Sequence, residues 1–397
     1  MFSFKEFVNK KILIFGYGKT GKSVEKFFKK KNIRHSIWDD KIKNKKFDKN
    51  FYKKNYDFIV LSPGIDIYHH KKKKFFKKHK SKIITDLDIF FSLTKNYKYT
   101  IGITGTNGKS SFCNLLKLIL KKNKINSKII GNFGNPVLEG DFSEKKYYII
   151  ELSSYQLDYS KYIKLNSACI LNVSPDHLER HLNLKNYKKI KLKIFKFLKE
   201  QGKGFYHKSS FPNYRSKLNI KYFKNINKNL ISNIIGKKIK ISKKVLNSNT
   251  LAHRNELFFK KNNFNFVNDS KSTNFDSTRF AIKKNKNVYL ILGGLLKKGD
   301  NYNIKDLISK IKKIYIFGKN TKILKKSFNK QKISYNYFKD LKNVLKDFYN
   351  KDFKYKNNLS KKYTLLFSPG GASFDQYKNF EHRGEKFKKY IYELFKR

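Results

Sequence analysis

A glycine-rich segment at residues 102–110 places a Lys-Ser pair directly after a tight turn. It reads Gly-Ile-Thr-Gly-Thr-Asn-Gly-Lys-Ser, and an apolar, strand-like run leads into it. Glycines let backbone N–H groups approach phosphates, Lys109 supplies a positive charge, and the Ser110 hydroxyl suits Mg²⁺. A tight turn with a surface lysine is the alternative. The strand, the glycines and the Lys-Ser pair together favour a site for ATP phosphates.

A carboxylate and an imidazole follow two further strand-like runs. Glu151 ends the run 147–150, and beside a phosphate-binding loop it fits a second Mg²⁺ ligand, although alone it would be typical of a solvated strand end. In the segment 171–181, His177 offers an imidazole for a metal or a phosphate, and Asp176 can orient it. Lys191 lies in a lysine-dominated helix, so composition alone assigns it no role.

The N-terminal segment carries a second glycine pattern, Gly-Tyr-Gly-Lys-Thr-Gly at residues 16–21. Asp39 and Asp40 end the next strand-like run, so the pattern fits glycines for a diphosphate and an acid for a ribose. Any diphosphate nucleotide satisfies these requirements, which leaves a nicotinamide oxidoreductase open as a weaker alternative. Ser62-Pro63-Gly64 follows another apolar run and is expected to line the same cleft.

Three polar segments of the last third also follow apolar runs. They are residues 268–274, Gly293-Gly294 with Lys297 downstream, and residues 368–376. Hydroxyl groups, ammonium groups and backbone amides at neighbouring strand ends would suit a small dicarboxylate.

Short apolar runs alternate with longer amphipathic ones, which predicts an α/β protein. We expect strands at 11–15, 33–38, 58–61, 99–103, 147–151, 168–172, 288–292, 313–317 and 363–368. We expect helices at 20–30, 109–122, 187–198, 273–282, 341–348 and 384–395. Strand–glycine–helix starts near 16, 105 and 293 indicate three domains, 1–95, 96–250 and 251–397, with boundaries near Asn96 and Thr250. Residues 201–250 show little periodicity.

The 397 residues include 92 Lys and Arg but only 29 Asp and Glu, which gives a net charge of +63. Such a charge suggests a protein that binds nucleic acid or an anionic membrane. Only seven of the 92 are arginine, whose bidentate fork suits phosphates and bases better than lysine does. We therefore interpret most of the lysine excess as compositional drift on solvated surfaces. Because 16% of the residues are aromatic, the chain is expected to fold.

Cellular location is expected to be cytoplasmic. Cys113 and Cys169 lie in apolar runs and form neither a disulfide framework nor a metal cluster. No apolar run reaches the length of about 18 residues that spans a membrane. The N-terminus leads directly into a strand-like run rather than a signal peptide.

Taken in order, these segments resemble the Mur ligase family over nearly the whole chain. The matching motifs are GTNGKS, ELSSYQL, LNVSPDHLERH, NDSKSTN and SPGGASFDQYKNFEHRGEKF. The resemblance implies three domains: a Rossmann-like domain binding a UDP sugar (1–95), a central P-loop ATPase domain with a mostly parallel sheet (96–250), and a Rossmann-like domain receiving the amino acid (251–397).

The implied reaction is ATP-dependent and belongs to peptidoglycan precursor synthesis. It joins D-glutamate to UDP-N-acetylmuramoyl-L-alanine through an acyl phosphate and uses two Mg²⁺. The resemblance also implies a monomer whose partners are small molecules, with neither a specific nucleic-acid partner nor a membrane insertion. ATP and amino acid would come from different domains, so the family's reaction implies closure of the C-terminal domain. A related ligase for another amino acid and a basic nucleic-acid-binding ATPase remain the alternatives.

The resemblance also implies roles for individual residues. Residues matching UDP contacts are Gly18, Lys19, Thr20, Asp39, Ser62 and Gly64, and those matching contacts to the rest of the acceptor are Asn132, Ser153, Gln156 and His177. ATP would be bound by Gly105, Thr106, Asn107, Gly108, Lys109, Ser110 and Ser111 with Arg254 and Asp269. Catalysis would use Lys109, Glu151, His177 and Lys191, and the metal ligands would be Ser110, Glu151, His177 and Lys191 as a carbamylated lysine. D-Glutamate would be received by Lys271, Thr273, Lys297, Ser373 and Phe380.

Overall fold

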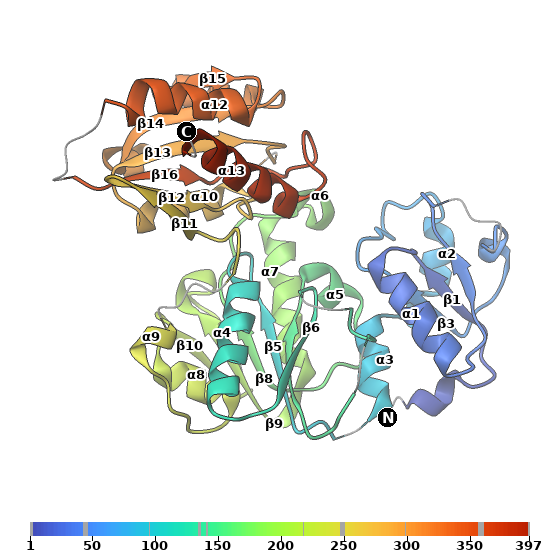
Figure 1. Cartoon of the computed structure of the whole chain (residues 1–397). Helices are drawn as coiled ribbons and strands as arrows, with labels where there is room; N and C mark the ends of the chain where they lie inside the picture. The colour runs from blue at the N-terminus through green and yellow to red at the C-terminus, as the bar shows by residue number, and fades with distance from the viewer. Residues whose placement is uncertain are drawn as a thin grey trace. The chain divides into compact units, whose positions relative to one another are not determined.

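The structure is a computed structural model that describes residues 3–42, 47–94, 96–133, 136–139, 142–216, 218–246, 251–297, 299–355 and 361–395. The chain forms two compact units, Met1–Ser248 and Asn249–Arg397. Three sheets, each flanked by helices, make up these units (Figure 1), so the expected α/β class with mostly parallel strands is confirmed. Among the described residues, none of the helices combines the length and apolar character needed to cross a membrane.

The first sheet of Met1–Ser248 is entirely parallel, in the order β2-β1-β3-β4. Its strands are β1 (Ile12–Phe15), β2 (Ser36–Trp38), β3 (Phe58–Leu61) and β4 (Ile83–Ile84). The associated helices are α1 (Lys19–Lys30), α2 (Lys73–Lys78) and α3 (Asp86–Leu93).

The second sheet of this unit is also parallel, in the order β10-β9-β8-β5-β7-β6. Its strands are β5 (Tyr99–Thr104), β6 (Ser127–Gly131), β7 (Tyr147–Glu151), β8 (Leu165–Ile170), β9 (Leu198–His207) and β10 (Ile220–Phe223). The helices are α4 (Lys109–Lys122), α5 (Ser154–Tyr159), α6 (Leu178–His181), α7 (Leu184–Leu192), α8 (Lys228–Ile235) and α9 (Lys243–Leu246).

Alternate residues of β7 enter different cores, which shows that both faces of this sheet are covered. Tyr147 and Ile149 pack with residues of α4 and α8, while Tyr148 and Ile150 pack with Leu157 of α5 and with the segment 194–197. Burial on both faces is typical of a parallel sheet.

The described residues of Asn249–Arg397 form a sheet in the order β11-β12-β16-β13-β14-β15, in which β11 runs antiparallel to β12 and the other described pairs are parallel. The strands are β11 (Glu256–Lys261), β12 (Phe264–Asn268), β13 (Val288–Gly293), β14 (Ile311–Phe317), β15 (Asn336–Phe338) and β16 (Tyr363–Phe367). The helices are α10 (Phe275–Lys284), α11 (Lys322–Lys330), α12 (Leu341–Phe348) and α13 (Phe380–Phe395).

Several expected elements differ from those in the structure. The helix expected at 187–198 is wrong at both ends, because α7 starts at Leu184, a 3₁₀ helix covers Lys193–Phe197, and Leu198 begins β9. The strands expected at 33–38 and 168–172 are Ser36–Trp38 and Leu165–Ile170, and the helices expected at 273–282 and 384–395 are Phe275–Lys284 and Phe380–Phe395. Residues 201–250, whose little periodicity led to no predicted element, contain most of β9 and all of β10, α8 and α9. The expected boundary at Thr250 lies outside the described residues.

Candidate active site

The central strands of the second sheet bring four polar segments to one edge. Strands β6, β7, β5 and β8 are parallel neighbours, so their carboxyl ends meet. Asn132 follows β6, Glu151 ends β7, the glycine-rich loop 105–108 follows β5, and the segment 171–177 follows β8. Binding sites of parallel α/β sheets lie at this edge.

The glycine-rich loop ends in a conformation that favours glycine. Gly108 has φ +81° and caps the N-terminus of α4, where backbone N–H groups point toward the loop. The Lys109 ammonium donates hydrogen bonds to the carbonyl oxygens of Gly105 (2.7 Å) and Thr106 (2.9 Å). The Ser110 side chain is buried in the first turn of α4. Ser111, next along α4, is half-buried.

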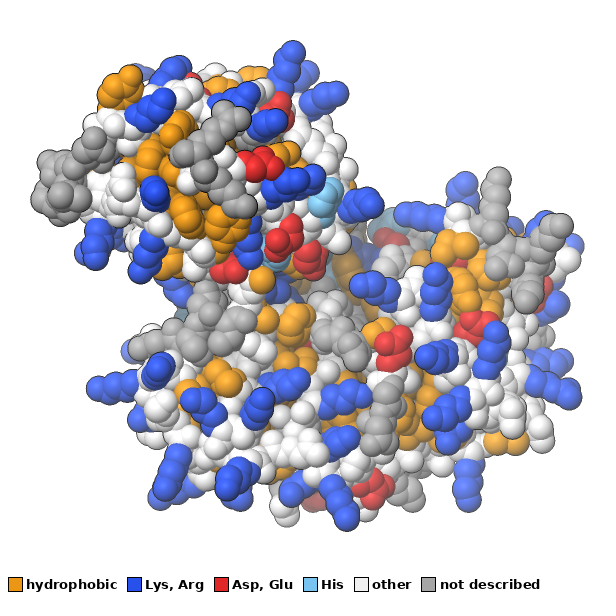
Figure 2. Space-filling view, viewed as in Figure 1, with side chains coloured by type: hydrophobic (Ala, Val, Ile, Leu, Met, Phe, Trp, Pro, Cys, Tyr) orange, Lys and Arg blue, Asp and Glu red, His pale blue; other side chains and the backbone are white. Residues whose placement is uncertain are grey.

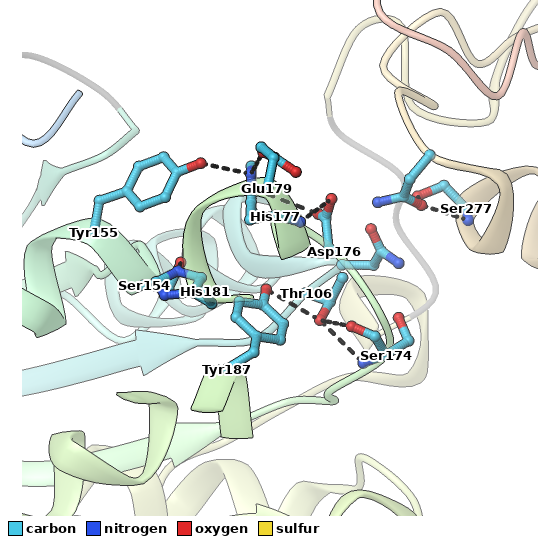
Figure 3. A network of polar contacts seen from close by, with 12 residues as sticks. Thr106, Ser154, Tyr155, Ser174, Asp176, His177, Glu179, His181, Tyr187 and Ser277 are labelled. Carbon is cyan, nitrogen blue, oxygen red and sulfur yellow. Dashed lines mark hydrogen bonds and ion pairs between the residues drawn. The ribbon is translucent and has the colours of Figure 1, made fainter. Parts of the chain in front are cut away.

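The loop after β8 is tied to the glycine-rich loop. The Asn107 N–H donates to Asn172 Oδ1, and Asn172 Nδ2 donates back to the Asn107 carbonyl, both at 2.9 Å. The Thr106 hydroxyl donates to the Ser174 carbonyl and accepts from the Ser174 N–H, both at 3.1 Å (Figure 3). Sequence reasoning gave Asn172 no role, although its place at a strand end beside the loop was a usable signal.

Glu151 is a buried acid, 1% exposed, at the end of β7. Its Oε1 accepts a hydrogen bond from Asn132 Nδ2 (2.8 Å), while its Oε2 is buried without a hydrogen-bond partner. A buried carboxylate oxygen without a partner is costly unless a cation or a donor completes it. Together with the hydroxyl of Ser110, this oxygen matches the donor set that Mg²⁺ prefers.

Lys191 lies in the interior although most lysines of the chain do not. Its side chain reaches from α7 to β5, where Nζ donates to the Gly105 carbonyl (3.0 Å) and to Thr104 Oγ1 (3.3 Å). Burial, followed by the charge of Lys109, holds the pKa of Lys191 well below its usual range. The amine is therefore neutral more readily than a surface lysine, and only a neutral amine reacts with CO₂ to give a carbamate.

His177 is held between an acid and a phenol. Its Nε2 lies 3.6 Å from Asp176 Oδ2, and its Nδ1 is 2.8 Å from the Tyr155 hydroxyl (Figure 3). His181, one helical turn away in α6, is hydrogen-bonded to the Ser154 hydroxyl (2.9 Å), and burial, followed by the charge of His177, lowers its pKa to about 4. His181 is therefore a neutral packing residue, whereas His177 is the half-exposed imidazole of the pair.

The described residues contain no cluster of three or more His, Cys, Asp or Glu side chains able to hold a metal ion by themselves. A metal at this edge would depend on Ser110, a carbamylated lysine and substrate phosphates as additional ligands. The oxygen donors that are present fit Mg²⁺ in this way.

Ser153 and Gln156 form the capping box of α5. The Gln156 N–H donates to Ser153 Oγ (3.2 Å), and the Ser153 N–H donates to Gln156 Oε1 (3.0 Å). Both residues therefore have a structural role at the beginning of α5.

The nucleotide-like pattern of the first sheet surrounds the end of β1. Asp39 Oδ2 accepts from the Tyr17 N–H (2.6 Å) and its Oδ1 from the N–H groups of Lys41 and Ile42 (2.8 and 2.9 Å). The Ser62 hydroxyl donates to the Gly16 carbonyl (2.8 Å). Gly18 caps α1, whose first residues are Lys19 and Thr20, while Gly64 lies in the loop after β3, where a side chain would meet open space.

Within Asn249–Arg397, most residues expected for nucleotide and amino acid follow β12, β16 and β13, which are neighbours in the sheet, whereas Arg254 precedes β11 and Phe380 begins α13. Asp269 accepts from Ser368 Oγ (2.7 Å) and the Asn255 N–H (2.9 Å), and burial raises its pKa to about 6, while the charge of Arg254 opposes the shift. Lys271 Nζ lies 4.0 Å from the centre of the Phe380 ring. Thr273 and Lys297 are half-buried and Ser373 is buried.

Comparisons with known proteins agree with this arrangement. Residues 103–288 match the model of the Mur ligase middle domain. A UDP-N-acetylmuramoylalanine–D-glutamate ligase of Rickettsia bellii is 34% identical, covering 94% of this chain and 95% of that protein. One of Francisella tularensis is 33% identical, covering 99% of each.

Solved structures of Mur ligases share the fold. The MurF ligase of Thermotoga maritima, solved in complex with ADP, has a TM-score of 0.57 and 16% identity, covering 99% of this chain and 97% of that one. MurC of the same organism has a TM-score of 0.55 and 12% identity, covering 97% of this chain and 100% of that one. Since sequence similarity to the curated ligases extends over nearly the full length of both chains, the protein belongs to the Mur ligase family, within the UDP-N-acetylmuramoylalanine–D-glutamate ligases.

Proposed function

We propose that the chain joins D-glutamate to UDP-N-acetylmuramoyl-L-alanine with ATP, releasing ADP and phosphate. Similarity over almost the whole chain to curated D-glutamate ligases carries this proposal. The sheet edge that combines the P-loop, Glu151 and Lys191 is consistent with ATP-dependent activation of a carboxylate.

A carboxylate is a poor electrophile, so it must be activated before an amine can attack it. The alanine carboxylate of the acceptor attacks the γ-phosphorus, which forms an acyl phosphate as the bond to ADP breaks. The amine of D-glutamate then attacks the acyl carbon, loses a proton, and displaces inorganic phosphate. Lys109 and the N–H groups at the start of α4 hold the phosphates during the first step, which depends on position and charge.

Two Mg²⁺ ions are part of the proposal. Ser110 and Glu151 would hold one ion, and His177 with Lys191 the other, after the Lys191 amine adds CO₂ and releases a proton to become a carbamate. The buried Oε2 of Glu151 and the lowered pKa of Lys191 support this assignment. Bound Mg²⁺ neutralises phosphate charge and orients the phosphates.

The remaining assignments divide the chain into three domains, 1–95, 96–250 and 251–397, each containing one sheet. Residues 1–95 would bind the UDP part through Gly18, Lys19, Thr20, Asp39, Ser62 and Gly64. The central domain would contact the sugar and peptide through Asn132, Ser153, Gln156 and His177. Residues 251–397 would contact the nucleotide through Arg254 and Asp269 and D-glutamate through Lys271, Thr273, Lys297, Ser373 and Phe380. The cytoplasm fits Cys113 and Cys169, which are buried cysteines outside any disulfide.

An amino-acid panel tests the proposal most directly. Phosphate release is measured with ATP, Mg²⁺ and UDP-N-acetylmuramoyl-L-alanine, with D-glutamate, L-glutamate, D-aspartate, L-lysine or no amino acid. We expect release with D-glutamate and little with the others. Equal release without an amino acid, or faster release with another one, would contradict the proposal.

Matched variants connect this activity to the site. Glu151→Gln keeps the size of the side chain and an oxygen for Asn132 but removes the negative charge, so D-glutamate-dependent release should fall about 100-fold or more. Glu200→Gln, on the exposed surface of β9, should leave the rate unchanged.

A further inference from the structure

Arg180 connects the two sheets of Met1–Ser248. It lies in the four-residue helix α6, three residues after His177, and its side chain is only 7% exposed. Its Nη2 donates to the Ile65 carbonyl at 2.7 Å, and its Nη1 lies 3.8 Å from Asp66 Oδ2. Ile65 and Asp66 belong to the loop that begins with Ser62 after β3. A side chain from the catalytic edge therefore holds the loop at the end of the first sheet.

Tyr159 completes this contact. Its hydroxyl donates to the same Ile65 carbonyl (2.9 Å), and it accepts hydrogen bonds from Arg180 Nη2 and from the Ile67 N–H. The loop is thus held by two side chains at one carbonyl oxygen. Among the described residues, the Arg180 Nε is buried without a hydrogen-bond partner, which makes the buried guanidinium costly to stability.

The contact continues from Arg180 to His177. The guanidinium carbon lies 5.2 Å from the centre of the Tyr155 ring, within the range of a cation–π interaction. The Tyr155 hydroxyl is hydrogen-bonded to His177 Nδ1 at 2.8 Å (Figure 3). An unbroken series of contacts therefore runs from the Ser62–Ile67 loop through Arg180 and Tyr155 to the imidazole.

We propose that Arg180 is a positioning residue that fixes the Ser62–Ile67 loop relative to His177, so that the two ends of one long acceptor are held at the correct distance and orientation. This rests on the proposed function, in which Ser62 and Gly64 of the loop contact the UDP part and His177 contacts the sugar and peptide part of the acceptor. The planar fork of an arginine fixes direction as well as distance, which the flexible ammonium of a lysine does not. A displacement of about 1 Å at a reacting group can cost a factor of about 100 in rate.

Comparing a fragment with the whole acceptor tests this role. The dissociation constants of UDP and of UDP-N-acetylmuramoyl-L-alanine are measured by calorimetry for the wild type, Arg180→Lys and Arg180→Met. UDP would contact residues of the first sheet and its loops but not His177, so its affinity should change less than about twofold, whereas the whole acceptor should bind about tenfold more weakly or worse. Steady-state kinetics should show a raised KM for the acceptor, a lowered kcat and an unchanged KM for ATP.

Controls separate positioning from folding. Arg215→Met removes an exposed arginine of the same unit and should change none of these values. If the Arg180 variants do not fold, Tyr155→Phe breaks the hydrogen bond to His177 without changing a buried charge, and it should weaken binding of the whole acceptor but not of UDP.

Two results would overturn the inference. An equal loss of affinity for UDP and for the acceptor would make Arg180 a residue that only shapes the loop, and unchanged affinity for both would leave it without this role. The wild type is assayed in the same series for D-glutamate-dependent phosphate release. Absence of that activity would refute the proposed function instead.

Discussion

Burying a lysine ammonium is costly, yet Lys191 is 1% exposed and its Nζ donates hydrogen bonds to a neutral carbonyl and a neutral hydroxyl. Such a side chain is better accommodated as a neutral amine. Its place beside the glycine-rich loop is what the proposed role of Lys191, as a lysine that gains a carbamate, would need.

Replacing Lys191 by alanine should remove most activity and leave a space where a small carboxylate can bind. We expect Lys191→Ala to lower D-glutamate-dependent phosphate release about 10- to 100-fold or more, and acetate or formate to restore part of it. The measurement is a titration of the variant with each acid. Lys189→Ala, an exposed lysine of the same helix, should stay at the wild-type rate. A fully active Lys191→Ala variant would show that Lys191 has no role in the activity.

The sequence alone identifies Lys109 as a residue of the site but does not identify Lys191. Lys109 is predictable because strand, glycines and helix start have a fixed order around it. Lys191 has no such pattern among 85 lysines, and only the family resemblance singles it out. Thr106, Tyr155 and Arg180 were also not predicted to position other groups, because their partners lie up to 115 residues away in sequence.

Among the helices and strands, the bounds were predicted best where the segment's own sequence pattern is clear. The expected bounds of β3, α4, β7 and α12 agree with the structure. These segments carry continuous apolar runs or a clear helical face. The change from helix to strand at Leu198 was missed because local propensity there is overridden by pairing of β9 with β8 and β10. In residues 201–250, frequent lysines obscure the apolar period of β10 and α8.

The start of α3 carries a buried acid whose protonation should make stability depend on pH. Asp86 is 4% exposed, and burial raises its pKa to about 7 from 3.8, with Asp88 adding to the shift and the Leu87 N–H opposing it. Between these two values the folded chain holds a proton that the unfolded chain has lost. This contribution to the free energy of unfolding therefore falls as the pH rises from about 4 to about 7.

Replacing Asp86 by asparagine should remove that dependence, because the amide is nearly isosteric and stays neutral. We expect Asp86→Asn to be more stable than the wild type at pH 8, by up to about 4 kcal/mol, and the difference to shrink toward pH 5. Urea denaturation at the two pH values measures it. Glu200→Gln, exposed on β9, should leave the pH dependence unchanged. A variant less stable than the wild type at pH 8 would show that the ionised carboxylate is stabilised in the fold.

For the whole molecule, the strand–glycine–helix starts expected near 16, 105 and 293 indicated three α/β units. The glycine positions lie at the ends of β1, β5 and β13, which belong to three different sheets. The first two lead directly into α1 and α4, whereas β13 is followed by a loop and the 3₁₀ helix Lys305–Lys310. The sequence could not give the strand order, because it depends on which strands pair across long separations. The antiparallel β11 and the series of contacts through Arg180 are likewise products of tertiary packing.

The charge of +63 is the remaining property of the whole molecule. In Figure 2, lysine and arginine side chains are spread over the visible face and interrupted by other residue types rather than gathered in one stripe. Nucleic-acid binding by diffuse lysines is an effect of bulk charge, which salt screens strongly. A diffuse basic surface can still raise the rate of encounter with small anionic substrates such as ATP and the UDP sugar.

The enzyme should therefore bind duplex DNA only at low salt and should not use it. We expect retention of labelled DNA at about 0.02 M salt, its loss by about 0.2 M, and no increase in D-glutamate-dependent phosphate release at either concentration. Under the same conditions, kcat/KM for the acceptor should fall with salt while kcat stays constant, because screening slows encounter but leaves the bound complex unchanged. The neutral polymer dextran serves as the control for crowding. Stimulation of phosphate release by DNA at 0.15 M salt would show that the lysines form a functional nucleic-acid site after all.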